Sequence, residues 1–252
     1  MRILTARRTL LKMGLVAVAL PHLFRTANAA ARPAAVVELF TSQGCSRCPP
    51  ADALFAELAE RNDIIALSYH IDYWDYLGWD DQFATPENTD RQRAYGEVLG
   101  TGVYTPQIVV NGHIDVVGAD RNALSQALRS SPGAGDALTV DVTSSSSNQN
   151  IAIEIGEGIA QAAGAHVILA YYRPRHTVEI SAGENKGKTV EYRNIVTDFQ
   201  TVGVWHGKPM RLEFPKTEIK SKGGCCAVLV QSTDEDGNPK AILGAAQVKT
   251  VS

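Results

Sequence analysis

The stretch VVELFTSQGCSRCPP, at residues 36–50, contains the features that decide the fold. Its first five residues are mostly apolar, as expected of a buried strand. Two cysteines follow in the turn Cys45-Ser46-Arg47-Cys48, and Pro49 and Pro50, next in the chain, are tolerated best in the first turn of a helix. A strand that passes through a dithiol turn directly into a helix predicts an α/β unit with both cysteines at the sheet edge.

The segments that follow alternate between helix-like and strand-like patterns. A strand–helix–strand unit of this length implies that its two strands are parallel. Asn111-Gly112 is a preferred type I′ hairpin dipeptide, and Asp120 is a suitable helix N-cap. We expect, in order, a helix to about residue 60, a strand at 64–71, a helix at 86–99, strands at 107–110 and 114–117, and a helix at 119–129.

The second half of the chain reads almost entirely as short strands. The turn-prone sequence SSPGAG at residues 130–135 separates the two halves. We therefore expect an α/β domain at 34–131, with a mixed sheet flanked by helices, and an all-β domain at 137–252. Several short strands separated by turns favour a mostly antiparallel, β-sandwich-like arrangement for the second domain.

The first 29 residues have the three parts of a twin-arginine signal peptide. Arg7-Arg8 precede an apolar pair and a lysine, residues 13–20 form a short apolar stretch, and Ala27-Asn28-Ala29 offers a cleavage site. An N-terminal amphipathic helix is the alternative. We expect export to the periplasm or the exterior, with no membrane span after signal removal.

Composition and charge narrow the classes of partner. The chain has 252 residues, 44% of them apolar, which is enough to bury a substantial core. Residues 1–29 hold five of the 24 basic residues and none of the 27 acidic ones, so the remainder carries a net charge of −8. Such an acidic surface argues against nucleic acid and anionic membranes as partners.

The dithiol carries the strongest chemical signal. A helix N-terminus stabilises a thiolate, so we expect Cys45 to be the attacking thiol and Cys48 the resolving thiol, with Arg47 adding positive potential. This chemistry needs the Cys45 sulfur within reach of a substrate. Pro49 and Pro50 lack N–H groups, so the helix is expected to begin near Cys48 and to help Cys45 less. A structural disulfide and half of a zinc site remain as alternatives.

The order of elements and the dithiol resemble the thioredoxin superfamily over about residues 36–129. That resemblance implies a thioredoxin-like fold for the first domain. It also implies a cis peptide bond between Thr105 and Pro106, which would face the dithiol and help to hold the substrate chain. An ordinary trans proline at a strand start is the alternative.

A narrower resemblance involves Cys-x-x-Cys-Pro-Pro. Residues 37–52, 70–79 and 104–107 are similar to a bacterial family of secreted thioredoxin-like proteins of unknown function. This resemblance implies a fold and a redox site, and no substrate.

Three further residues are candidates for the site. In thioredoxins a buried acid near the position of Glu38 exchanges protons with the second cysteine, so Glu38 is either that base or a solvent-facing edge residue. Trp74 belongs to an aromatic loop at 73–79 that either borders the dithiol and binds a partner or fills the contact between the domains. His70 is either a hydrogen-bonded structural residue or a metal ligand.

The leading hypothesis is an exported thiol–disulfide oxidoreductase that acts on protein or small-molecule thiols and disulfides, and we expect no bound cofactor. The first alternative is a copper or zinc protein that uses Cys45, Cys48 and His70. The second is a non-catalytic interaction protein with a static disulfide. Cys225-Cys226 reads as two small strand residues, with a vicinal disulfide or a second redox relay as the alternatives.

Overall fold

The computed structural model describes residues 32–130, 138–160 and 164–248. The expected signal peptide at 1–29 lies outside the described residues, as does the expected domain boundary at 131–137.

The first half contains the expected elements in the expected order. The Asp120 carboxylate accepts a hydrogen bond from the Ala123 N–H at 2.9 Å, and Asn111 and Gly112 both have positive φ, at 50° and 75°, as a type I′ turn requires. The elements are β1 (Ala35–Thr41), α1 (Pro49–Ala59), β2 (Ile64–His70), the 3₁₀ helix η1 (Asp75–Leu77), α2 (Pro86–Leu99), β3 (Gln107–Val110), β4 (Ile114–Val117) and α3 (Arg121–Ser130).

The second half is mainly strands, as expected, with one short helix between β9 and β10. The elements are β5 (Val142–Ser146), β6 (Asn150–Ile155), β7 (Ala165–Glu179), β8 (Thr189–Trp205), β9 (Met210–Pro215), α4 (Lys216–Ser221), β10 (Cys225–Thr233) and β11 (Pro239–Val248).

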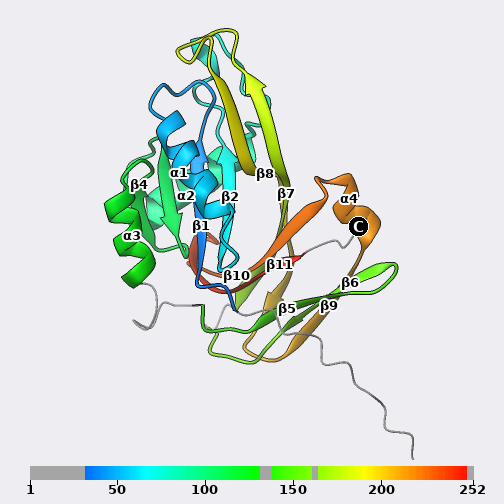
Figure 1. Ribbon diagram of the computed structural model, residues 1–252. Coiled ribbons are helices and arrows are strands. Elements are labelled where there is room, and N and C mark those ends of the chain that lie inside the picture. The colour runs from blue at the N-terminus through cyan, green and yellow to red at the C-terminus, as the bar shows by residue number, and fades with distance from the viewer. Residues whose placement is uncertain (1–31, 131–137, 161–163, 249–252) are drawn as a thin grey trace, which may run out of the picture.

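The two halves share one sheet, whereas the sequence pattern predicted a separate β-sandwich for the second half. Eight strands run in the order β11-β10-β7-β8-β2-β1-β3-β4, and β5-β6-β9 form a second, antiparallel sheet (Figure 1). The halves join where Ser68 of β2 pairs in parallel with Ile195 of β8, and the Asn194 side chain donates to the Ala66 carbonyl beside it at 2.9 Å. Four strands of the second half thus extend the sheet of the first.

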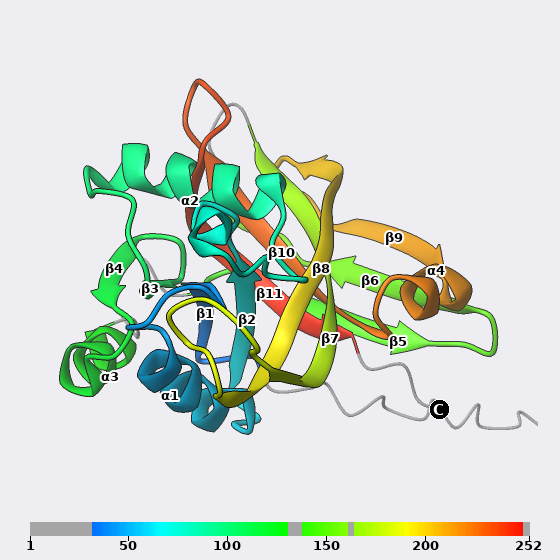
Figure 2. The ribbon, with the colours of Figure 1, turned by 90° about the horizontal axis from the view of Figure 1, so that it is seen from above.

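The large sheet is covered on both faces. Figure 2 shows α2 on one side of it and α1 and α3 on the other. Alternation along β1 divides the core accordingly, because Val36 and Phe40 pack in the cluster with Tyr95 of α2, while Val37 and Leu39 pack with α1 and α3. Beyond the helices, the second sheet covers β7 and β10 and encloses a separate apolar cluster.

The hairpin of β7 and β8 is much longer than its neighbours. Strand β10 pairs with β7 only at residues 165–172, and β2 meets β8 at Ile195, so residues 173–194 extend past the rest of the sheet. Figure 1 shows this part of the hairpin reaching the end of the molecule where β1 leads into α1. Its tip, residues 180–188, therefore lies near the dithiol turn.

Candidate functional site

Cys45 and Cys48 form a disulfide with their Cα atoms 5.4 Å apart. Helix α1 begins at Pro49 with Cys48 as its N-cap, which confirms the expectation that the helix starts near the second cysteine. The turn is closed by the main chain, since the Cys45 N–H donates to the Ser42 carbonyl and the Cys48 N–H to the Cys45 carbonyl, both at 3.2 Å.

The start of α1 offers the sulfur atoms few hydrogen-bond donors. Pro49 and Pro50 have no N–H, and the N–H groups of Ala51 and Asp52 donate to the Cys48 carbonyl at 2.8 and 3.0 Å. Arg47 is exposed. The usual stabilisation of a thiolate by a helix end is therefore weaker here than in a helix without these prolines.

Both cysteines are buried, which differs from the expectation that a substrate reaches Cys45 directly. The exposed fraction is 1% for Cys45 and 0% for Cys48, whereas Ser46 and Arg47 between them are exposed. Two segments from elsewhere in the chain pack on this turn, the aromatic loop at 73–79 at Gly44 and the tip of the β7–β8 hairpin at the Gln43 and Cys45 carbonyls.

Trp74 covers the turn from the side of the aromatic loop. A Cβ on Gly44 would lie 3.0 Å from the Trp74 Cβ and 3.3 Å from its carbonyl oxygen, so the indole-bearing residue packs directly on the turn. The indole N–H donates to the Thr105 hydroxyl at 2.8 Å. Trp74 therefore connects the dithiol turn to the Thr105-Pro106 segment. Of the residues expected to bind substrate, Trp74 and Thr105 lie next to the turn.

Pro106 lies beside the first turn of α1. The Thr105–Pro106 peptide bond is cis, as the resemblance implied. A Cβ on Gly118 would lie 3.0 Å from the Pro106 Cβ and 3.2 Å from the Ala51 Cβ, so Pro106 and the first turn of α1 both border Gly118.

Asn185 packs on the turn from the hairpin tip, and no motif in the sequence analysis pointed to it. Its side-chain amide donates to the main-chain carbonyls of Gln43 and Cys45, both at 2.8 Å, and its oxygen accepts from the Lys188 ammonium group at 2.8 Å. Asn185 is itself 1% exposed. More than 130 residues of chain separate it from the cysteines, so no local pattern could have placed it there.

Three buried titratable side chains, Asp52, His70 and Asp81, lie close enough together to affect one another's pKa. Asp52 is on α1 one turn after Cys48, and burial raises its pKa to about 7, although the Thr41 hydroxyl donates to it at 2.8 Å. His70 Nδ1 lies 2.7 Å from Asp81, whose other contacts include the Gln43 N–H. Burial lowers the pKa of His70, but the charge and hydrogen bond of Asp81 outweigh it and raise the pKa overall.

Glu38 does not join this cluster. It shares the α2 face of β1 with Val36 and Phe40, while α1 lies on the opposite face. Its carboxylate is fully buried and accepts from the Arg91 guanidinium at 2.8 Å and from the Tyr95 hydroxyl. Proton exchange between Glu38 and Cys48 does not fit this placement, and neither does a solvent-facing edge. Asp52 is the buried acid on the same helix face as Cys48, as the i, i+4 spacing could have indicated.

Comparison with known proteins identifies the family. A family model described as "Protein of unknown function (DUF1223)" matches residues 36–231. The chain belongs to this family. A solved structure of protein AGR_C_4864 from Agrobacterium tumefaciens is 41% identical, covers 86% of this chain and 95% of its own, and has a TM-score of 0.78. No curated protein matches the chain.

A more distant solved structure, HBP35 of Porphyromonas gingivalis, is similar to this DUF1223 chain in fold alone. It is 13% identical, covers 86% of this chain and 75% of its own, and has a TM-score of 0.58.

The remaining cysteines and the metal alternative gain no geometric support. Cys225 and Cys226 are free thiols on β10, the second one buried, and burial raises the pKa of Cys226 to about 12. Within residues 32–130, 138–160 and 164–248, no three His, Cys, Asp or Glu side chains are arranged to hold a metal. His70, the third ligand of the metal alternative, contacts Asp81 through Nδ1, and its Nε2 is buried without a hydrogen-bond partner among the described residues.

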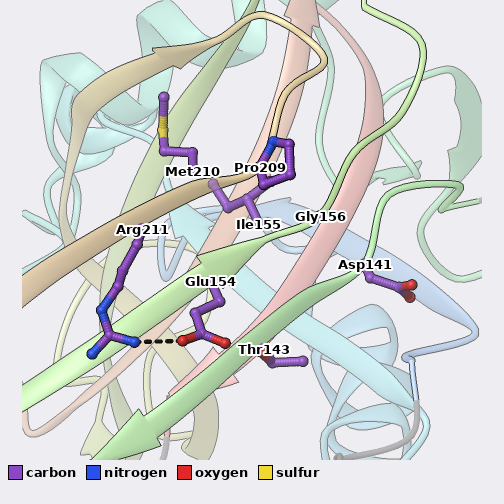
Figure 3. Close-up of a pocket in the computed structure, with 8 residues that line it drawn as sticks. All are labelled: Asp141, Thr143, Glu154, Ile155, Gly156, Pro209, Met210 and Arg211. Atoms are coloured by element: carbon purple, nitrogen blue, oxygen red, sulfur yellow. Dashed lines mark hydrogen bonds and ion pairs between the residues drawn. The ribbon is translucent and has the colours of Figure 1, made fainter.

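A hollow of about 410 Å³ lies away from the cysteines, on the second sheet. Figure 3 shows its lining side chains, including the ion pair between Arg211 and Glu154. Its lining contains no cysteine or histidine. No helix in the described parts of the chain is long and apolar enough to cross a bilayer.

Proposed function

We propose that this protein is an exported thiol–disulfide oxidoreductase whose first half is a thioredoxin-like domain. The observation that carries the proposal is the Cys45–Cys48 disulfide at the N-cap of α1, with the Thr105–Pro106 segment beside the same helix turn. A disulfide that closes so short a loop adds little chain entropy to stability, which favours a chemical role over a structural one.

The reaction is a pair of thiol–disulfide exchanges. A substrate thiolate attacks the Cys45 sulfur, a substrate–Cys45 bond forms, the Cys45–Cys48 bond breaks, and Cys48 leaves as a thiolate that takes up a proton. A second substrate thiolate then attacks its partner sulfur in the mixed disulfide and releases Cys45. The substrate leaves oxidised by two electrons and the protein is reduced; the reverse sequence reduces a substrate disulfide.

Asp52 is the proposed proton carrier for Cys48. Its side chain lies one helical turn after Cys48 on the buried face of α1. Burial raises its pKa to about 7, so it holds and releases a proton near neutral pH, as a general acid–base group requires. The neighbouring His70–Asp81 pair acts on the pKa of Asp52 in both directions, since the charge of His70 lowers it and that of Asp81 raises it.

The proposed location and partners follow from the N-terminus and the charge. The twin-arginine pattern directs the protein to the periplasm or the exterior, where disulfides persist. The proposed substrates are protein or small-molecule thiols and disulfides, with a redox partner protein to restore the active form. Arg47 lies between the two cysteines with an exposed side chain, so it is available to contact these substrates.

Trapping of the mixed disulfide tests the proposal. The mature protein is reduced and mixed with a peptide disulfide, and non-reducing gels are read for adducts. Cys48→Ser should accumulate a Cys45–substrate adduct, Cys45→Ser should not, and the matched control Cys225→Ser should turn over like the wild type. If neither single variant forms an adduct and the wild type shows no exchange, the static-disulfide alternative replaces the proposal.

A further inference from the structure

The tip of the β7–β8 hairpin, residues 180–188, is a compact unit that closes over the dithiol turn. Within the tip, the Ile180 N–H donates to the Lys188 carbonyl at 2.9 Å and the Gly187 N–H to the Ile180 carbonyl at 2.7 Å. These bonds hold the tip in its own shape independently of the dithiol turn. It can therefore move as a unit on the long hairpin that carries it.

The contact between the tip and the turn is concentrated in one side chain. Both hydrogens of the Asn185 amide are used on the carbonyls of Gln43 and Cys45, so a single rotation or displacement of this residue breaks both bonds. Beside it the tip also makes an apolar contact with the loop that holds Trp79: a Cβ on Gly183 would be 3.0 Å from the Trp79 Cβ, and Ile180 belongs to a buried cluster against which Trp79 and Phe83 pack.

Closure blocks the chemistry of the proposed site. Exchange requires an incoming thiolate to approach the Cys45 sulfur along the line of the S–S bond. At 1% exposure Cys45 offers no such approach, and the covering elements have to separate before any substrate can react.

The groups beneath Asn185 match the backbone of a polypeptide. The carbonyls of Gln43 and Cys45 each lose a donor once Asn185 leaves, and the Cys45 carbonyl then keeps only the Cys48 N–H. Gln43 also has a donor to offer, because its Nε2 is buried without a hydrogen-bond partner among the described residues. The Trp79 indole N–H fixes this orientation by donating to Gln43 Oε1 at 2.8 Å. Two acceptors and one donor along a short stretch fit the alternating N–H and C=O groups of an extended chain.

From this arrangement we propose that the hairpin tip is a latch, held shut by Asn185, which opens to an extended polypeptide and excludes small thiols. The inference rests on the proposed function of the dithiol and specifies its substrate class and its control. A polypeptide replaces both hydrogen bonds that Asn185 gives up, while a small thiol leaves the Gln43 carbonyl without the Asn185 donor and the Cys45 carbonyl with the Cys48 N–H alone.

The first test measures how fast dithiothreitol reduces the Cys45–Cys48 disulfide in the oxidised full-length mature protein. One dithiothreitol sulfur forms a mixed disulfide with Cys45, and the second closes the oxidised ring and releases both protein thiols. Asn185→Ala should be reduced at least tenfold faster than the wild type. Asn185→Asp should also be faster, because it keeps the size and the Lys188 contact and loses the donor hydrogens.

Lys186→Ala is the matched control, since its side chain is exposed on the same tip. It should be reduced within twofold of the wild-type rate. The latch proposal would be overturned if both Asn185 variants, each with a native circular dichroism spectrum, were reduced by dithiothreitol at the wild-type rate. Equal acceleration in Lys186→Ala would overturn the assignment to Asn185.

The second test compares a ten-residue peptide containing one cysteine with N-acetylcysteine amide at equal thiolate concentration. The wild type should react at least fivefold faster with the peptide, and Asn185→Ala should reduce that ratio. Equal wild-type rates would overturn the polypeptide assignment. A faster Asn185→Ala reduction without any trapped Cys48→Ser adduct would instead mean a latch over a static disulfide, so the two proposals fail separately.

Discussion

Replacing Asp52 by asparagine removes one proton-binding group from the core and should make the protein more stable at alkaline pH. Burial raises the pKa of Asp52 to about 7, whereas an aspartate in an unfolded chain titrates near pH 4. The folded state therefore binds this proton more tightly than the unfolded state. Stability from this group is fully present below about pH 4 and is lost as the pH rises to about 7.

The magnitude follows from the width of that window. Each pH unit between the two pKa values changes the free energy of unfolding by at most about 1.4 kcal/mol, so three units give a ceiling of about 4 kcal/mol. The charges of His70 and Asp81 act on Asp52 in opposite directions. We expect Asp52→Asn to exceed the wild type by about 2–4 kcal/mol at pH 8 and to match it within about 1 kcal/mol at pH 4.5.

The assay is urea unfolding followed by tryptophan fluorescence from pH 4.5 to 8.5, with the disulfide intact. Asparagine keeps a carbonyl oxygen for the Thr41 hydroxyl, so the comparison isolates the proton. Glu57→Gln, on the exposed side of the same helix, is the control: Arg121 lowers the pKa of Glu57, so this carboxylate stays charged from pH 4.5 to 8.5 and its loss should shift stability by a nearly constant amount. Parallel stability curves for the wild type and Asp52→Asn would refute the reasoning.

Two further substitutions test the buried contacts around the site. Arg91→Met leaves the Glu38 carboxylate buried without its ion pair and should cost about 3–5 kcal/mol in urea unfolding, while the Glu38→Leu, Arg91→Met double variant should recover at least half of that loss. An Arg91→Met variant as stable as the wild type would contradict the expected cost of leaving the Glu38 carboxylate unpaired. Gly44→Ala forces a methyl group against Trp74 and should cost about 1–3 kcal/mol; an unchanged urea midpoint would show that the turn has room to spare.

The local structure of the first half could be predicted because each element has its own signal. The prolines after Cys48 fixed the start of α1, and Asn111-Gly112 fixed the hairpin between β3 and β4. The second half shows the limit of such signals. That half read correctly as strands, but pairing of Ile195 with Ser68 depends on contacts between distant segments, so a separate sandwich was expected where one continuous sheet exists.

The site divides in the same way. The Cys45–Cys48 pair forms a disulfide, the Thr105–Pro106 bond is cis as the resemblance implied, and Trp74, which the sequence left between two roles, packs on the dithiol turn and bonds Thr105. Glu38 was assigned to the cysteines because a buried acid was expected near them, and the period of two along β1 places it on the other face. Asn185 closes the site from the second half of the chain, and only the long hairpin explains how it arrives there.

The reduction potential of the Cys45–Cys48 pair is the most direct test of a thiol–disulfide role. It is measured by equilibrating the full-length mature protein in glutathione or dithiothreitol buffers and counting free thiols by mass after alkylation. The account predicts a single two-electron transition between about −270 and −120 mV, the range of exchange-active dithiols. A potential below about −300 mV, typical of structural disulfides, would contradict it.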